Sequence, residues 1–192
     1  MTKGEAKAAA LRWLDEATVG GREADSDELA DYKNRMDTLL DSAVQQLATQ
    51  FPLCAVWESE GSSEITLPED FYELETVLSQ TQQGIWCEFS GMQRVGQKTF
   101  LLEQGAGLLR FYYHRLPQHI APDDEDSTVL DLAPGTEDLL ALRLAADVTA
   151  GTEEKSGVST MLDARFQNAA LNRMTQWQNH RTRIETRYGG LL

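Results

Sequence analysis

The sequence has no long hydrophobic run. Among its 192 residues no apolar stretch approaches the roughly 18 that are needed to cross a bilayer, so a transmembrane helix is not expected. The N-terminal stretch MTKGEAKAAALRWLDEA is charged throughout and lacks the apolar core and the cleavage site of a secretory signal. We therefore expect a protein of the cytoplasm rather than of the membrane or the secretory pathway.

Cysteine is scarce as well. The two cysteines, Cys54 and Cys87, lie far apart in the apolar stretches PLCAVW and GIWCEF. A cysteine in such surroundings usually behaves as a small buried hydrophobe. The sequence therefore predicts two buried, reduced thiols, with neither a redox nor a metal-binding role.

Basic residues are outnumbered by acidic ones. The chain has 17 Lys and Arg against 31 Asp and Glu, which gives a net charge of −14. Residues 1–50 carry 6 basic and 10 acidic side chains (−4), residues 51–159 carry 6 and 19 (−13), and residues 160–192 carry 5 and 2 (+3). Tight phosphate binding requires a basic face, so most of the chain would repel nucleic acid.

Familiar catalytic and cofactor motifs are missing. Neither GxSxG nor HExxH occurs, and the glycine pairs of GMQRVG and GAG do not open a helix, as a phosphate-binding loop must. The acidic stretch DDEDST fails as a calcium loop, because its sixth position is Thr128 and its twelfth is Pro134, where glycine and glutamate are required. We expect no enzyme, no catalytic residue and no cofactor.

The remaining titratable pairs do not change that expectation. His114 and His119 have no further ligand at a suitable spacing, so no metal site is predicted. Glu73 and Glu75 are close in sequence, but paired carboxylates are common in an acidic chain, and we interpret these two as exposed strand acids.

Helical periodicity is present at both ends of the chain. Residues 1–52 predict a helical hairpin, in which Thr2 and Glu5 have the spacing of a capping box and the second helix ends near Gln50. Residues 136–187 predict two more helices. The first of these is apolar nearly all round, which is typical of a helix at the centre of a bundle.

Short β-type runs separated by glycine-containing breaks fill residues 53–116 and predict a small antiparallel sheet of three to five consecutive strands. Residues 117–135 form an acidic strap, which prolines keep extended and acids keep in water. Residues 188–192 form a flexible tail. The predicted fold class is mainly α: a helical bundle with an inserted small antiparallel β-sheet (α+β).

The end of the last helix combines arginine, aromatic residues and leucines. Such a composition is typical of an interface anchor. The candidate partner-binding residues are Arg173, Trp177, Arg181, Arg183, Arg187, Tyr188, Leu191 and Leu192.

The stretches ITLPEDFYELETV, FYYHRLP, DDED and TEDLLALRLAADV follow one another between two helical segments. In this order the chain resembles the head-to-tail adaptor proteins of tailed bacteriophages, also called connector, tail tubular or head-completion proteins. The resemblance covers nearly the whole chain in the order of its elements. It brings no catalytic motif with it and implies a structural role.

The resemblance further implies a homo-oligomeric ring, commonly twelvefold, beneath the portal protein of the DNA-filled head. The C-terminal residues named above would dock on the portal, and a tail protein (nozzle or tail tube) would bind below. Genomic DNA would pass through without specific binding, and no membrane is involved. Such a protein belongs to the virion neck and, during assembly, to the host cytoplasm. An acidic body suits the wall of a DNA channel because it does not hold phosphates.

Two other functions stay open from the sequence. The sheet aromatics Phe89, Phe100, Phe111 and Tyr113 would form the pocket of a small-ligand or peptide-binding module. An acid–base hydrolase is the second alternative, although no carboxylate lies in a clearly apolar stretch.

Overall fold

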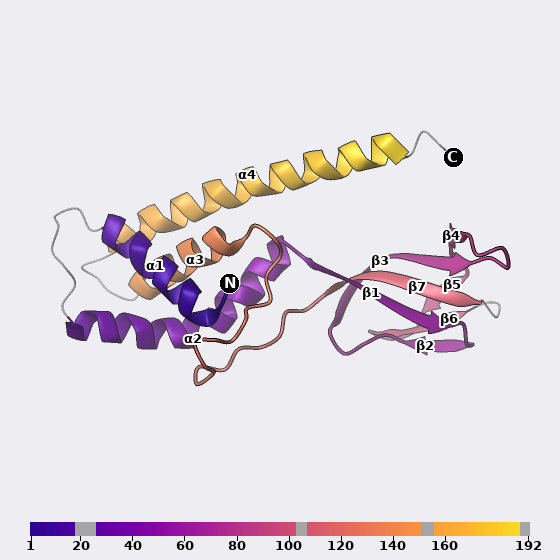
Figure 1. The fold of residues 1–192 in the computed structure, drawn as a ribbon, viewed down its shortest axis with the longest axis horizontal. Coiled ribbons are helices and arrows are strands. Elements are labelled where there is room, and N and C mark those ends of the chain that lie inside the picture. Colours follow the sequence, from indigo (N-terminus) through magenta and orange to yellow (C-terminus); the bar gives the residue numbers. More distant parts are fainter. Residues whose placement is uncertain (18–25, 103–106, 151–155, 189–192) are drawn as a thin grey trace. The chain divides into compact units, whose positions relative to one another are not determined.

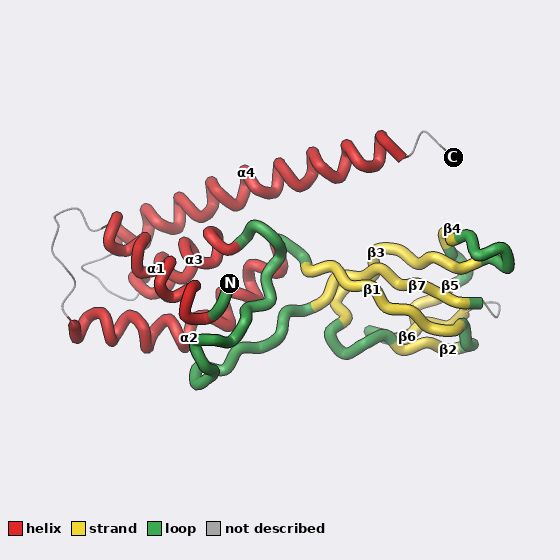
Figure 2. Tube along the Cα trace, in the orientation of Figure 1, coloured by secondary structure: helices red, strands yellow, loops and turns green. Residues whose placement is uncertain are grey.

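The computed structural model divides the chain into two compact units, one formed by Met1–Phe51 together with Gln118–Leu192 and the other by Pro52–Pro117. It describes the backbone of residues 1–17, 26–102, 107–150 and 156–188, and the side chains of residues 1–14, 30–102, 107–150 and 157–176. Helices occupy the first unit and strands the second (Figures 1 and 2). The predicted α+β class is confirmed. In chain order the elements are α1 (Lys3–Ala17), α2 (Ser26–Gln50), β1 (Leu53–Glu60), β2 (Glu64–Thr66), β3 (Phe71–Gln80), β4 (Trp86–Glu88), β5 (Met92–Arg94), β6 (Thr99–Leu102), β7 (Leu108–Arg115), α3 (Glu137–Ala150) and α4 (Ser156–Tyr188).

The first helix begins with the predicted capping box. The Thr2 N–H donates to Glu5 Oε2 at 2.8 Å, and the Glu5 N–H donates to Thr2 Oγ1 at 3.2 Å. This exchange satisfies two N–H groups that a helix start would otherwise leave without acceptors. The helix then buries Ala6, Ala10 and Leu14 at helical spacing.

Helix α3 is the centre of the helical unit, as its composition predicts. Nine of its 14 residues are buried, and Leu140, Leu144 and Ala145 are fully inaccessible. Helices α1, α2 and α4 all pack on it. A helix that is apolar nearly all round can be stable only where other helices cover every side.

Helix α4 is much longer than α3, the helix against which it packs. It has 33 residues against 14 in α3, so at 1.5 Å per residue it is about 50 Å long against about 21 Å. Among its side chains described from 157 to 176, the buried ones are Leu162, Phe166 and Ala170. Helix α3 therefore covers only the first part of α4.

The strap is more firmly held than predicted. Its acids are exposed or half-buried, as expected, but Ile120 and Leu130 are only 6% and 5% exposed. The start of the chain pairs with the strap: the Lys3 N–H donates to the Thr128 carbonyl at 2.8 Å, and the Leu130 N–H donates to the Met1 carbonyl at 3.0 Å. The strap is therefore hydrogen-bonded to the start of the chain in addition to presenting its acids to water.

The strand unit contains two antiparallel sheets, where one was expected. The described strands have the orders β1-β7-β3-β4 and β2-β6-β5. We expected strands that follow one another in sequence to be neighbours in the sheet. This prediction is wrong for β7, the last strand, which lies between β1 and β3. A hairpin rule pairs strands that follow one another in sequence, so it cannot predict that β7 pairs with both β1 and β3.

Aromatic side chains form the core of the strand unit. The ring of Phe111 lies 5.4 Å from that of Trp57, and the ring of Phe71 lies 5.7 Å from Tyr113 and 6.3 Å from Phe100. Tilted and edge-on pairs at these separations add to the stabilisation from apolar burial.

None of the helices in the described ranges is both long and apolar enough to cross a membrane.

Candidate functional site

The predicted docking segment lies on the distal part of α4. Arg173 is half-buried, and its guanidinium lies against Gly135, the glycine just before α3. The backbone of residues 177–188 is helical up to Tyr188. The side chains of Trp177, Arg181, Arg183, Arg187 and Tyr188, and the whole of Leu191 and Leu192, lie outside the described residues.

The helical backbone alone determines which of these positions share a side. At 3.6 residues per turn, the six candidate positions from 173 to 188 fall within about 160° of the helix circumference. The buried positions of Leu162, Phe166 and Ala170 fall within the same sector. The face that α4 buries in its first half therefore continues into its second half as a sector of arginine and aromatic positions.

A second charged cluster joins α1, α2 and the strap. The carboxylate of Asp37 on α2 lies 3.0 Å from the ammonium groups of both Lys3 and Lys7. The Lys3 side chain is 1% exposed, and its ammonium also donates to the carbonyls of Pro122 at 2.7 Å and Asp124 at 2.8 Å. A lysine this deeply buried requires such a full set of acceptors.

The pKa shifts in this cluster favour the charged forms. Burial raises the pKa of Asp37, but hydrogen bonds and charges from Lys7 and Lys3 outweigh it and bring the pKa below its ordinary value. Burial likewise lowers the pKa of Lys7, but Asp126 and Asp37 outweigh it and raise the pKa. Groups held in their charged forms are poorly suited to exchange protons near neutral pH. The cluster is a clamp that joins the strap to α1 and α2.

His114 and His119 have different surroundings. His119 Nδ1 lies 3.0 Å from the carboxylate of Asp41, which also accepts the Ile120 N–H at 3.0 Å. Burial raises the pKa of Asp41, but these contacts outweigh it and lower the pKa. His114, on β7 of the strand unit, instead lies beside Glu73 and Glu75.

The proposed aromatic pocket is not formed. Phe100, Phe111 and Tyr113 are 3%, 0% and 4% exposed and belong to the core of the strand unit, against which Phe89 packs partly buried. Burial raises the pKa of Tyr113, and the charge of Asp70, whose carboxylate accepts its hydroxyl at 3.1 Å, raises it further. These rings hold the sheets together and are not available to a ligand.

Both cysteines contradict the expectation of burial. Cys54 and Cys87 are exposed thiols. Cys54 lies on the outward-facing side of β1, where it pairs with His114 across the sheet. Sequence reasoning missed this neighbourhood because the two residues are 60 positions apart and only the pairing of β1 with β7 brings them together. The segment LCAVWESE has no alternation of apolar and polar residues, and only the two-residue period of a strand, seen in its burial from Leu53 to Glu60, indicates that every second residue faces outward.

No protein-family model matches the sequence, and no curated protein matches it. Among solved structures, the chain is similar to one from the neck of an empty GTA particle computed with C6 symmetry. The match covers 72% of this chain and 77% of that chain, with 10% sequence identity and a TM-score of 0.30. A TM-score at this level does not establish a common fold.

Proposed function

We propose that this chain is a structural, non-enzymatic adaptor of a phage or prophage neck. It forms a ring beneath the portal, commonly twelvefold in the family that it resembles, and joins the DNA-filled head to the tail while DNA passes through. The order of elements that carries the resemblance supports the proposal: two helices, an inserted strand unit, an acidic strap and two further helices.

The main support for the proposal is the face of α4 that is buried in the first half of the helix and continues into its second half. Along this face Leu162, Phe166 and Ala170 are buried, and α4 packs with α3. Beyond Arg173 the same sector holds Trp177, Arg181 and Arg187, while Glu185 falls outside it. A helix that presents arginine and aromatic positions along one side is suited to an acidic groove on another protein. The portal is the partner that fits this role.

The charge distribution supports the remaining parts of the function. A ring closed by head-to-tail contacts needs two different, complementary surfaces on each subunit, and a strongly acidic body with a mildly basic end is compatible with that requirement. An acidic channel wall lets DNA pass because it offers no cations to the phosphates.

The docking face can be tested by charge reversal with a matched control. In the test variant, Arg181, Arg183 and Arg187 are changed to Glu. In the control variant, Gln178, Thr182 and Thr186 are changed to Glu, at positions on the opposite side of the helix. Each is mixed with the portal protein encoded by the same phage or prophage, and the complexes are sized by gel filtration with light scattering.

We expect the unmodified chain and the control variant to form a ring-sized complex with the portal, and the test variant to remain unassembled. Circular dichroism checks that all three fold alike. If the test variant bound the portal as strongly as the unmodified chain does, α4 would not be the docking face. Failure of every variant, including the unmodified chain, to associate with any portal would overturn the adaptor function itself.

A further inference from the structure

Three metal-ligating side chains converge on the outward face of the four-stranded sheet. Cys54 on β1 pairs with His114 on β7, and Glu73 on β3 pairs with His114 from the other side. Directly paired residues of neighbouring strands point to the same face of a sheet. The thiol of Cys54, the imidazole of His114 and the carboxylate of Glu73 are therefore held on one surface by the register of three strands.

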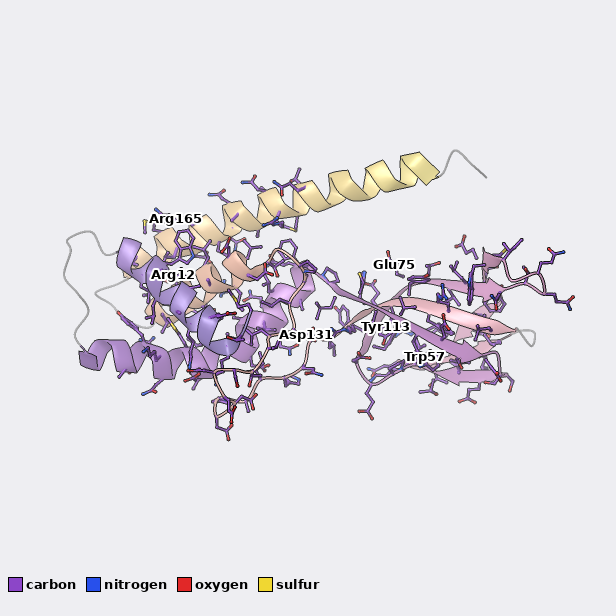
Figure 3. All side chains as sticks on the ribbon, viewed as in Figure 1. Arg12, Trp57, Glu75, Tyr113, Asp131 and Arg165 are labelled. Atoms are coloured by element: carbon purple, nitrogen blue, oxygen red, sulfur yellow. The ribbon has the colours of Figure 1, made fainter. Side chains whose placement is uncertain are left out.

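An irregularity in β3 brings a second carboxylate to the group. The pairing of β3 with β7 shifts between Leu74 and Thr76, so Glu75 is an extra residue in its strand. A bulge of this kind re-aims a side chain relative to the regular alternation. Glu75 (Figure 3) consequently reaches His114, and its carboxylate lies 4.0 Å from His114 Nε2.

The separations suit a common ion. The ligand atoms of Cys54, Glu75 and His114 all lie within 4.8 Å of one another. With zinc bonds of about 2.3 Å to sulfur and about 2.0–2.2 Å to nitrogen and oxygen, tetrahedral ligands are about 3.4–3.6 Å apart. To bind one ion, the three ligand atoms would have to move closer to one another by only about 1 Å. Rotation of the side chains is enough for such a movement, and the strands can stay in place.

The second nitrogen of His114 has the partner that a metal-bound histidine requires. Nδ1 lies 3.4 Å from Glu73 Oε2, on the opposite side of the ring from the Nε2 that faces Glu75. Histidines that bind a metal through one nitrogen almost always donate the other N–H to a carboxylate or carbonyl, which fixes the ring orientation. Glu73 is placed to be this positioning residue.

We propose that Cys54, Glu75 and His114 bind a divalent transition-metal ion of the zinc type, with His114 Nε2 as the nitrogen ligand and Glu73 orienting its ring. The mixture of thiolate, imidazole and carboxylate selects this class, because calcium and magnesium prefer sets made only of oxygen ligands. Three protein ligands leave the fourth position of a tetrahedral ion to water or to an external donor. The proposal does not depend on the adaptor function.

The first experiment is a calorimetric titration of the full, tag-free chain with Zn²⁺. We expect one ion per chain and at least about a hundredfold weaker binding in Cys54→Ser and in His114→Gln. Glu73→Gln is expected to bind about 10–100-fold more weakly, the usual effect of losing an orienting partner. The matched controls are Cys87→Ser and His119→Gln, which remove a thiol and an imidazole elsewhere and are expected to bind like the unmodified chain.

The second experiment uses the two thiols as an internal comparison. Alkylation with iodoacetamide, read out for each cysteine by mass spectrometry, is expected to slow at Cys54 when Zn²⁺ is added and to recover with EDTA. Cys87, which is also exposed, is expected to react at the same rate throughout. Because Cys54 is exposed, its change to serine is expected to preserve the fold, which circular dichroism checks.

Cobalt gives a direct signature of the ligand set. Co²⁺ bound to a thiolate in a tetrahedral site shows intense visible bands and a sulfur-to-metal charge-transfer band, and both are expected to be lost in Cys54→Ser. The proposal is overturned if the unmodified chain binds no Zn²⁺, if Zn²⁺ slows both thiols equally, or if Cys87→Ser and His119→Gln weaken binding as much as their counterparts in the site.

Discussion

Lys3 shows how a single residue can hold a segment of irregular backbone. Its ammonium lies in contact with the Asp37 carboxylate and three strap carbonyls, and its side chain is 1% exposed. Neither helix propensity nor periodicity singles it out, because a lysine in the first turn of a helix is ordinarily solvated. The capping box one residue earlier was predictable, since both of its members lie within four residues of sequence.

Replacing Lys3 tests this clamp. In Lys3→Met the strap carbonyls lose their donor and Asp37 keeps only Lys7, so we expect the free energy of unfolding of the helical unit to fall by about 3 kcal/mol. Urea unfolding followed by circular dichroism measures it. Lys33→Met, at an exposed position of α2, is the matched control and is expected to change stability by less than about 0.5 kcal/mol. Equal effects of the two substitutions would show that Lys3 contributes nothing beyond an ordinary surface lysine.

Asp37 gives the clamp a pH dependence of defined sign. Its folded-state pKa lies below the ordinary 3.8 because the effect of Lys7 and Lys3 exceeds that of burial. The unfolded chain therefore binds the proton more tightly, so the ionised carboxylate stabilises the fold above about pH 4, and this stabilisation is lost as the pH falls through the lower folded-state value. Asp37→Asn is expected to be less stable at neutral pH and to lose less stability on acidification.

The check is the free energy of unfolding measured at neutral pH and at several acidic pH values. Asp123→Asn, an exposed strap substitution, serves as the control and is expected to retain the slope of the unmodified chain. An identical slope in Asp37→Asn would contradict the assignment of this acid sensitivity to Asp37.

At the scale of elements, the helices were largely predictable and the sheets were not. Helix α3 could be placed at the centre because its apolar residues cover nearly its whole circumference. The order β1-β7-β3-β4 depends on pairings between residues such as Leu53 and Arg115, which lie 62 positions apart, and no local pattern encodes them. The pairing of the exposed Cys54 with the half-buried His114 was missed for the same reason.

The turn before α3 allows a prediction about the stability of the helical unit. Gly135 has φ = +78°, a left-handed backbone conformation, and lies against the guanidinium of Arg173. We expect Gly135→Ala to destabilise the helical unit by about 1–2 kcal/mol, the cost of a side chain in this conformation. Thermal or urea unfolding measures the effect.

The matched control for this turn lies in the first turn of α4. An added Cβ at Gly157 would meet nothing within 4 Å, and the residue is helical. Gly157→Ala is therefore expected to be neutral or to stabilise by up to about 1 kcal/mol. A stabilising Gly135→Ala would show that this turn tolerates another conformation and that Arg173 is not held there.

At the scale of the whole molecule, the two units differ in how they are built. The helical unit is assembled from both ends of the chain and is held by buried apolar faces and the Lys3–Asp37 clamp, whereas the strand unit is one continuous insertion with an aromatic core. An insertion of this kind is recognisable in sequence because the period of the hydrophobic pattern changes near residue 52 and changes back after the strap.

The net charge of −14 leads to a prediction about DNA. An adaptor that lines a channel must not retain the genome, and binding to duplex DNA gains its strength from cations that neutralise phosphates. We expect no retardation of a double-stranded fragment in a gel at about 0.15 M salt. Any weak retardation at low salt should vanish when residues 178–192 are deleted, because this removes Arg181, Arg183 and Arg187. Binding that persists at physiological salt, and weakens steeply as salt is raised, would mean that DNA is a ligand of this protein and would contradict a channel wall that only lets it pass.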